Sequence, residues 1–257
     1  MFRYYFRKII VCPATYISAV LLFLSMVLSL DSEATAQPAY LFDSAYAFGL
    51  STYFLPVVAV LPISFLRQAL RKGSAWQFPL LHSAPLRYTL AGLAAAFLSG
   101  ALVMLLSAGL FHLYVVLFLK GPVSYAYSLF DGIYFYSLMS NQAGYLLRIG
   151  VYAVNAGMYA MIAYGVSGLS SNQYICAASG FAFWIVASVL AQTAARYAPE
   201  EARLLCYALD PGQCTPGGVM TQTRDGGLIH LAVYVVVIAL VAGGGFFLRL
   251  KRRLNHG

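Results

Sequence analysis

The sequence predicts an all-α membrane protein with six transmembrane helices, from its composition, its long apolar segments and the distribution of its charges. Hydrophobic residues make up 61% of the chain and charged residues only 9%, whereas soluble domains carry about 25% charged residues. Lipid is therefore the predicted solvent for most of this single domain, residues 1–257. A membrane-spanning helix needs about 20 apolar residues. The segments that reach this length are 9–30, 45–66, 88–118, 144–169, 173–193 and 228–249.

Each of these segments is expected to be a helix, because lipid offers no hydrogen-bond partners to an unpaired backbone. Pro13 in the first segment and Pro56 and Pro62 in the second are expected as first-turn residues or kinks. The third segment is longer than a straight crossing needs, which predicts tilting or projection from the bilayer. Only residues 170–172 separate the fourth and fifth segments, a length that suffices for a helical hairpin.

The charged residues predict that both termini are cytoplasmic. All eight acidic residues follow the first, third or fifth apolar segment, whereas most basic residues flank the opposite ends. Lys and Arg are enriched in cytoplasmic loops, so this distribution gives an orientation. The net charge of +8 is assigned to contact with the anionic inner leaflet rather than with nucleic acid. The flanking basic residues are Arg3, Arg7, Lys8, Arg67, Arg71, Lys72, Arg87, Arg249, Lys251, Arg252 and Arg253.

Residues 1–8 predict a short helix that lies in the cytoplasmic interface. The i, i+3, i+4, i+7 spacing of apolar residues is formed by Phe2, Tyr5, Phe6 and Ile9, with two arginines on the opposite face. An ordinary positively charged flank is the alternative. A signal peptide is disfavoured, because the apolar run that follows exceeds the usual 7–15 residues.

The longest inner connection is residues 67–87. Gly73 is a candidate helix terminator, and Pro85 can open the next helix in its first turn. Between them lies a short amphipathic stretch that contains Trp76 and Phe78. This stretch could lie on the lipid headgroups or contact a cytoplasmic partner, and the residues alone favour neither.

Two outer segments are long, and they differ in character. Residues 120–143 are rich in aromatic side chains, which favours packing at the interface. Residues 194–227 are more polar and contain Cys206 and Cys214. An oxidising exterior favours a disulfide between these cysteines, with two free thiols as the alternative. A metal site is not predicted there, because this segment has no CxxC pair and no histidine.

A few residues inside the apolar segments indicate packing or polar contacts. The spacing of Gly92, Ala96 and Gly100 predicts close packing against another helix, either within the subunit or in a second copy. Asn155 and Tyr159 lie one turn apart and could line a polar path, or bond to a neighbouring helix. Arg148, near the outer end of its segment, is expected to snorkel or to pair with an outer acid.

The sequence lacks the motifs of ATP hydrolysis and of metalloproteases. It has no GxxxxGK[ST] loop and no HExxH pattern. Ser167, in a GxSG pattern, and His230 match the residue types used by intramembrane rhomboid proteases. The predicted topology places them at opposite ends of their helices, too far apart for a hydrogen bond. No catalytic residue and no metal site are predicted.

The order of these elements resembles the membrane subunit of a type-2 ABC exporter. The resemblance rests on Phe2-Arg3-Tyr4-Tyr5-Phe6-Arg7-Lys8-Ile9-Ile10 leading through Pro13, and on Gly73 followed by Pro85-Leu86-Arg87-Tyr88. In that family the N-terminal helix is an interfacial elbow, and the connection between the second and third spans couples to a separate ATPase. By this resemblance the ATPase-facing residues would be Arg71, Lys72, Gly73, Trp76, Phe78 and Arg87.

The resemblance implies a permease subunit in a bacterial plasma membrane. It would work as a homo- or heterodimer with a cytoplasmic ATPase subunit, and would move an amphipathic substrate outward. ATP hydrolysis would reside in the ATPase partner, and no cofactor is expected in this chain. Membrane lipids are the further expected partner, and nucleic acid is not expected. The alternative is a non-transporting membrane immunity factor or assembly scaffold with the same fold.

Overall fold

The computed structural model describes residues 2–30, 38–47, 49–72, 84–119, 140–215 and 227–256. Helices account for 90% of the structure and the described residues contain no strand, which confirms the all-α prediction. The helices are α1 (Phe2–Val11), α2 (Pro13–Leu28), α3 (Pro38–Ala47), α4 (Ser51–Val58), α5 (Leu61–Lys72), α7 (Pro85–Phe118), α9 (Asn141–Leu169), α10 (Gln173–Tyr197), α11 (Glu200–Tyr207), the 3₁₀ helix η2 (Pro211–Cys214) and α12 (Leu228–His256).

Within the described ranges, four helices are long and apolar enough to cross a membrane: α7, α9, α10 and α12. The number rises to six if each of two bent helix pairs counts as one span. One pair is α1 with α2, which meet at 57°, and the other joins α3 to α4 and α5 at 74°. The part of the chain that the structure describes is therefore helical with four to six candidate spans, which agrees with the multi-pass prediction.

The bend between α1 and α2 follows from local sequence. Pro13 occupies the first turn of α2, where its missing N–H costs no helical hydrogen bond. The Thr15 hydroxyl donates to the carbonyl oxygen of Ile9 at 2.8 Å and ties the two helices together. On the apolar face of α1, Tyr5 and Ile9 are buried, whereas Phe2 remains exposed. The N-terminal helix thus packs partly on the bundle.

The second predicted span, residues 45–66, differs from the structure, which divides this region among three helices. α4 contains Pro56 and ends at Val58, and α5 starts at Leu61 with Pro62 in its first turn. A proline removes one helical hydrogen bond and clashes with the preceding turn, which accounts for the interruption. Most of α3 precedes the second predicted span, yet its Phe42 side chain is fully buried.

The centre of the bundle is α9, which contacts α4, α5, α7, α10 and α12. Gly92 and Gly100 of α7 face Tyr164 and Ala156 of α9, and Ala96 between them is fully buried. The small-residue face of α7 therefore packs within the subunit. Close approach of backbones is the usual reason for such residues between membrane helices.

We expect the Gly100→Ala substitution to destabilise the chain, because the added Cβ would overlap the backbone carbonyl of Ala156. Overpacking of this kind costs about 1–3 kcal/mol. Gly109, on the same helix, has no atom within 4 Å of such a Cβ. Gly109→Ala is the matched control and should be neutral or stabilising by up to about 1 kcal/mol. Thermal unfolding of the two purified variants in detergent tests this, and equal midpoints would contradict the assigned packing.

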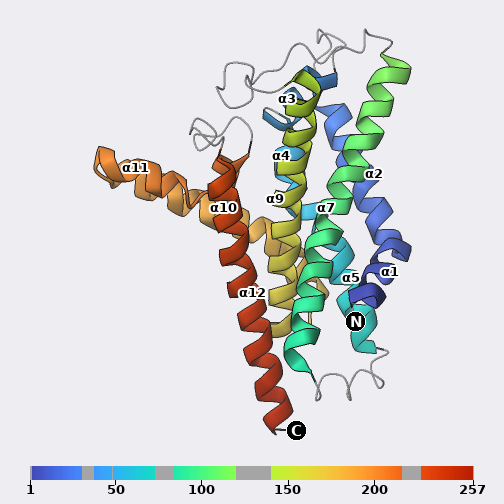
Figure 1. Ribbon diagram of the computed structural model, residues 1–257, viewed down its shortest axis with the longest axis vertical. Coiled ribbons are helices and arrows are strands. Elements are labelled where there is room, and N and C mark those ends of the chain that lie inside the picture. The colour runs from blue at the N-terminus through green and yellow to red at the C-terminus, as the bar shows by residue number, and fades with distance from the viewer. Residues whose placement is uncertain are drawn as a thin grey trace.

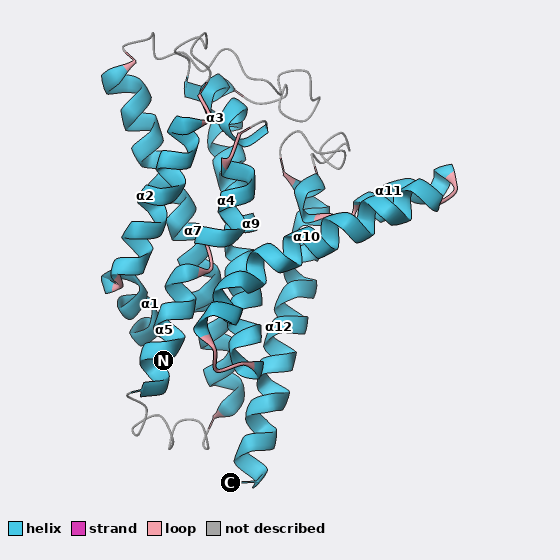
Figure 2. Cartoon of the chain, turned by 180° about the vertical axis from the view of Figure 1, so that it is seen from behind, coloured by secondary structure: helices cyan, strands magenta, loops and turns pink. Residues whose placement is uncertain are grey.

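α10 and α11 form an arm that leaves the bundle at a steep angle (Figure 1 and Figure 2). Only two residues separate α10 from α11, and the two helices contact each other. After α11 the chain reaches η2, which again contacts α10. This route brings the polar outer segment back to the bundle, beside α9 and α10.

Candidate functional site

Most of the residues predicted to face an ATPase are at the edge of the described structure or outside it. Arg71 and Lys72 form the end of α5. Gly73, Trp76 and Phe78 lie outside the described residues. Arg87 is exposed in the first turn of α7. The connection itself therefore remains a prediction, but the residues that anchor its two ends are visible.

The side chain of Arg67, at the start of this connection, is buried with only 8% of its surface exposed. Its Nε donates to Ser167 Oγ at 3.2 Å, and an Nη donates to Tyr88 Oη at 3.0 Å. The guanidinium carbon lies 4.8 Å from the ring centre of Phe246 and 5.3 Å from that of Tyr164. Arg67 thus joins α5 to α7, α9 and α12.

Aromatic faces and hydroxyl groups, rather than a carboxylate, surround this charge. No acidic side chain among the described residues forms an ion pair with Arg67. Buried cations of this kind are stabilised by aromatic rings and by hydrogen bonds. We call Arg67, Tyr88, Tyr164, Ser167 and Phe246 the Arg67 cluster. Tyr5 of α1 packs edge-on against Tyr88, with 5.8 Å between ring centres, so the cluster also contacts the N-terminal helix.

A buried ion pair lies on another part of α9. Arg148 Nε is 3.0 Å from Asp43 Oδ1, with 3% and 0% of the two side chains exposed. Pairing with an outer acid, one of the two predicted outcomes for Arg148, is the one observed. The bond fastens α3 to α9. Near it, the ring of Tyr46 stacks on Tyr152 with 4.2 Å between centres.

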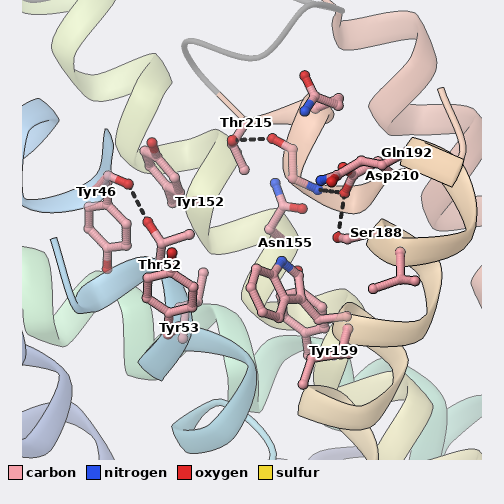
Figure 3. A pocket seen from close by; sticks show the side chains of 16 residues that line it. Tyr46, Thr52, Tyr53, Tyr152, Asn155, Tyr159, Ser188, Gln192, Asp210 and Thr215 are labelled. Carbon is pink, nitrogen blue, oxygen red and sulfur yellow. Dashed lines mark hydrogen bonds between the residues drawn. The ribbon is translucent and has the colours of Figure 1, made fainter. Parts of the chain in front are cut away.

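A pocket of about 370 Å³ opens between α4, α9, α10 and η2 (Figure 3). Five aromatic side chains line it, and no Lys, Arg or His side chain of the described residues does so. The aromatic residues at the pocket are Tyr46, Tyr53, Tyr152, Tyr159 and Trp184. The predicted polar-path residues Asn155 and Tyr159 both line this pocket, so the structure brings them to one site.

Two buried polar side chains face this aromatic space. Asp210 is 2% exposed, and its Oδ1 accepts hydrogen bonds from Ser188 Oγ at 2.7 Å and from the Gly212 N–H at 2.9 Å. Asn155 is fully buried and donates through Nδ2 to the Val151 carbonyl oxygen at 3.1 Å. Its Oδ1 has no hydrogen-bond partner among the described residues. The pocket thus offers one carboxylate and one unused acceptor.

Sequence reasoning missed Asp210 and Trp184 as site residues. Asp210 precedes Pro211-Gly212, a pattern typical of a solvent-exposed turn. Trp184 falls in an apolar helix and looks like an ordinary lipid-facing or packing residue. The available signal for Asp210 is an acid directly before a turn, whereas no sequence pattern separates Trp184 from other residues of an apolar helix.

Ser167 and His230 do not meet in the structure. The Ser167 hydroxyl donates to the Tyr164 carbonyl oxygen at 2.6 Å and accepts from Arg67. Its neighbour Gly168 packs on Phe246, which lies sixteen residues beyond His230, or about 24 Å along a helix.

The structure does not support the predicted disulfide between Cys206 and Cys214, because Cys206 is a free thiol. Cys206 lies in the last turn of α11, and the turn that follows is stabilised by Asp210 instead. Asp210 caps the start of η2 and bonds to Ser188 on α10. A disulfide requires a narrow range of distances between the two cysteines, and no two cysteines of the described structure lie at disulfide distance.

No protein-family model, curated protein or solved structure matches this chain. Its class follows from the fold: an all-helical chain with several apolar helices of membrane length, compatible with a multi-pass membrane protein.

Proposed function

We propose that the chain is the permease subunit of an ABC-type exporter. A separate cytoplasmic ATPase would act on residues 67–87, and a pair of permease subunits would move an amphipathic substrate outward. The observation that supports this proposal is the Arg67 cluster, since Arg67 and Tyr88 lie at the two ends of that connection and are joined by a hydrogen bond.

The cluster provides a physical route for coupling. A displacement of residues 67–87 by the ATPase would be transmitted to Arg67, whose guanidinium contacts Ser167 of α9 and Phe246 of α12. Movement of α5 would therefore turn α9 and α12 with it, as in rigid-body rocking of packed helices. ATP binding would cause this displacement by closing the ATPase pair.

The relative positions of the Arg67 cluster and the pocket agree with coupling that runs from residues 67–87 toward the pocket. Ser167 lies twelve residues after Asn155 on α9, or about 18 Å along the helix axis. α1 begins and α12 ends toward one end of the bundle, where α5 also ends (Figure 1). With both termini cytoplasmic, the Arg67 cluster faces the cytoplasm and the pocket lies toward the exterior.

Replacement of Trp76 and Phe78 by alanine is expected to reduce ATPase association and transport without unfolding the chain. Tyr174→Ala is the matched control, because Tyr174 is 74% exposed near the turn that joins α9 and α10. The measurement is co-purification of an ATPase subunit from native membranes, followed by ATP hydrolysis in proteoliposomes.

A chain that purifies as a monomer without ATPase in both detergent and nanodiscs would contradict the exporter proposal. Stable capture of a non-ATPase partner, with no transport, would favour the immunity-factor or scaffold alternative.

A further inference from the structure

We propose that the pocket between α4, α9, α10 and η2 binds an organic cation that carries an alkylated ammonium group. Binding itself does not depend on transport. The assignment of this cation as the exported substrate rests on the proposed function. Three features of the described residues support the proposal: a buried carboxylate without a cationic partner, a group of aromatic side chains and an unused hydrogen-bond acceptor.

The first feature is the carboxylate of Asp210. It is almost fully buried, and two donors reach its Oδ1. Among the residues that the structure describes, no Lys, Arg or His lines the pocket, and no basic side chain forms an ion pair with Asp210. A buried carboxylate is costly unless it is hydrogen-bonded and paired. A ligand ammonium in the pocket would provide that missing positive charge.

The second feature is the aromatic lining. Trp184 and Tyr53 meet edge to face, with 5.4 Å between ring centres and an angle of 90°. Tyr152 and Tyr159 lie on the α9 side of the same space (Figure 3). Cations are attracted to the faces of Trp and Tyr rings, and quaternary ammonium groups are commonly bound by such aromatic cages. This lining favours an alkylated ammonium over a strongly hydrated inorganic ion.

The third feature is Asn155, whose Oδ1 is buried and has no partner among the described residues. Its Nδ2 is already used by the Val151 carbonyl oxygen, so the amide presents an acceptor to the pocket. A hydroxyl or N–H group of the ligand could donate to it. The volume of about 370 Å³ lies within the range of small-molecule sites. An amino alcohol such as choline fits all three features.

A metal ion fits this site poorly. Ca²⁺ requires six to eight oxygen ligands, and Mg²⁺ requires a near-octahedral set. The described residues contain no group of three or more His, Cys, Asp or Glu side chains that could hold a metal ion. Asp210 is the only acidic residue in the described lining of the pocket. The aromatic surface, which such an ion could not use, is therefore better explained by an organic cation.

Fluorescence titration can test this proposal on the purified full-length chain without an ATPase. The chain has two tryptophans, Trp76 and Trp184. The Trp76→Phe background leaves Trp184 at the pocket as the sole reporter. We expect choline to change its fluorescence in a saturable way. We expect 3,3-dimethylbutan-1-ol, the neutral analogue with the same shape, to bind at least tenfold more weakly. Equal affinity for the two probes would overturn the proposal.

Asp210→Asn keeps the shape of the side chain and an oxygen acceptor but removes the charge, and is expected to weaken choline binding at least tenfold. Tyr53→Leu should weaken it several-fold; since 53% of Tyr53 is exposed, this change is expected to preserve folding. Tyr174→Leu, remote from the pocket, is the control. Unchanged choline affinity in folded Asp210→Asn and Tyr53→Leu variants would contradict the proposed binding site. Loss of ATPase association with choline binding retained would contradict only the exporter proposal.

The cation could be a free molecule or the headgroup of a lipid. Titration in nanodiscs of phosphatidylglycerol and of phosphatidylcholine separates these sources. Equal choline affinity in the two lipids indicates a free cation. Weaker apparent affinity in phosphatidylcholine indicates competition by its headgroup. No saturable choline binding in either lipid would overturn the proposal.

Discussion

Replacement of Arg67 by alanine is expected to destabilise the chain by about 3 kcal/mol or more. Arg67 donates two hydrogen bonds and lies against aromatic rings from α7, α9 and α12. Hydrogen bonds from charged groups contribute about 1.5–3 kcal/mol each, and a desolvated cation over an aromatic ring contributes about 2 kcal/mol. Part of this gain is offset, because the alanine variant no longer buries a charge.

Arg87→Ala is the matched control for this prediction. It removes the same charge at the other end of the same connection, but Arg87 is exposed. Its effect on stability should be within about 0.5 kcal/mol, as for other surface substitutions. Arg67→Lys retains the charge but loses the planar donor fork, so it should fall between the two. Denaturation in detergent measures all three, and equal losses for Arg67→Ala and Arg87→Ala would contradict the buried cluster.

The same set of variants also separates stability from coupling. If Arg67 transmits movement from residues 67–87, Arg67→Lys should retain ATPase association but lower substrate-stimulated hydrolysis more than its stability loss explains. If Arg67 has only a structural role, ATPase association and substrate-stimulated hydrolysis should both fall in proportion to the folded fraction of the variant. Measurement at a temperature where the lysine variant remains folded distinguishes these two outcomes.

Apolar segment length was a good guide to the helices, because helix formation in lipid depends on apolar length and backbone pairing. α7, α9 and α10 start and end within about four residues of the predicted boundaries, whereas α12 starts at the predicted residue 228 but continues past 249 to His256. The region of α3 to α5 was harder to predict. Its prolines interrupt the helix, and the partly polar helix α3 is held by tertiary contacts, including the hydrogen bond that Arg148 donates to Asp43.

The residues of the candidate site were likewise only partly predictable from the sequence. Asn155 and Tyr159 could be found because they are one turn apart on a single helix. Asp210 reaches them only because α11 and η2 return along α10, a route that the sequence alone did not indicate. Arg67 resembled an ordinary cytoplasmic flank, since a sequence does not show which of several basic residues turns inward.

Breaking the ion pair between Asp43 and Arg148 is expected to cost about 3–5 kcal/mol, because either single variant leaves a buried charge without this partner. Asp43→Asn and Arg148→Met are suitable single changes. Their combination should cost clearly less than the sum of the two, because no charge then remains buried. A double-mutant cycle on thermal unfolding measures this coupling directly. Additive losses would contradict a direct interaction between the two side chains.

Glu200 and Arg203, both exposed on α11, provide a control cycle with the same chemical changes. Exposed pairs of opposite charge contribute at most about 1 kcal/mol, so Glu200→Gln and Arg203→Met should show little coupling. The buried pair should also affect the pocket. Asp43 lies three residues before Tyr46 on α3, and Tyr46 stacks on Tyr152 at the pocket wall. Loosening α3 should therefore weaken choline binding in Arg148→Met but not in Arg203→Met, although neither arginine lines the pocket.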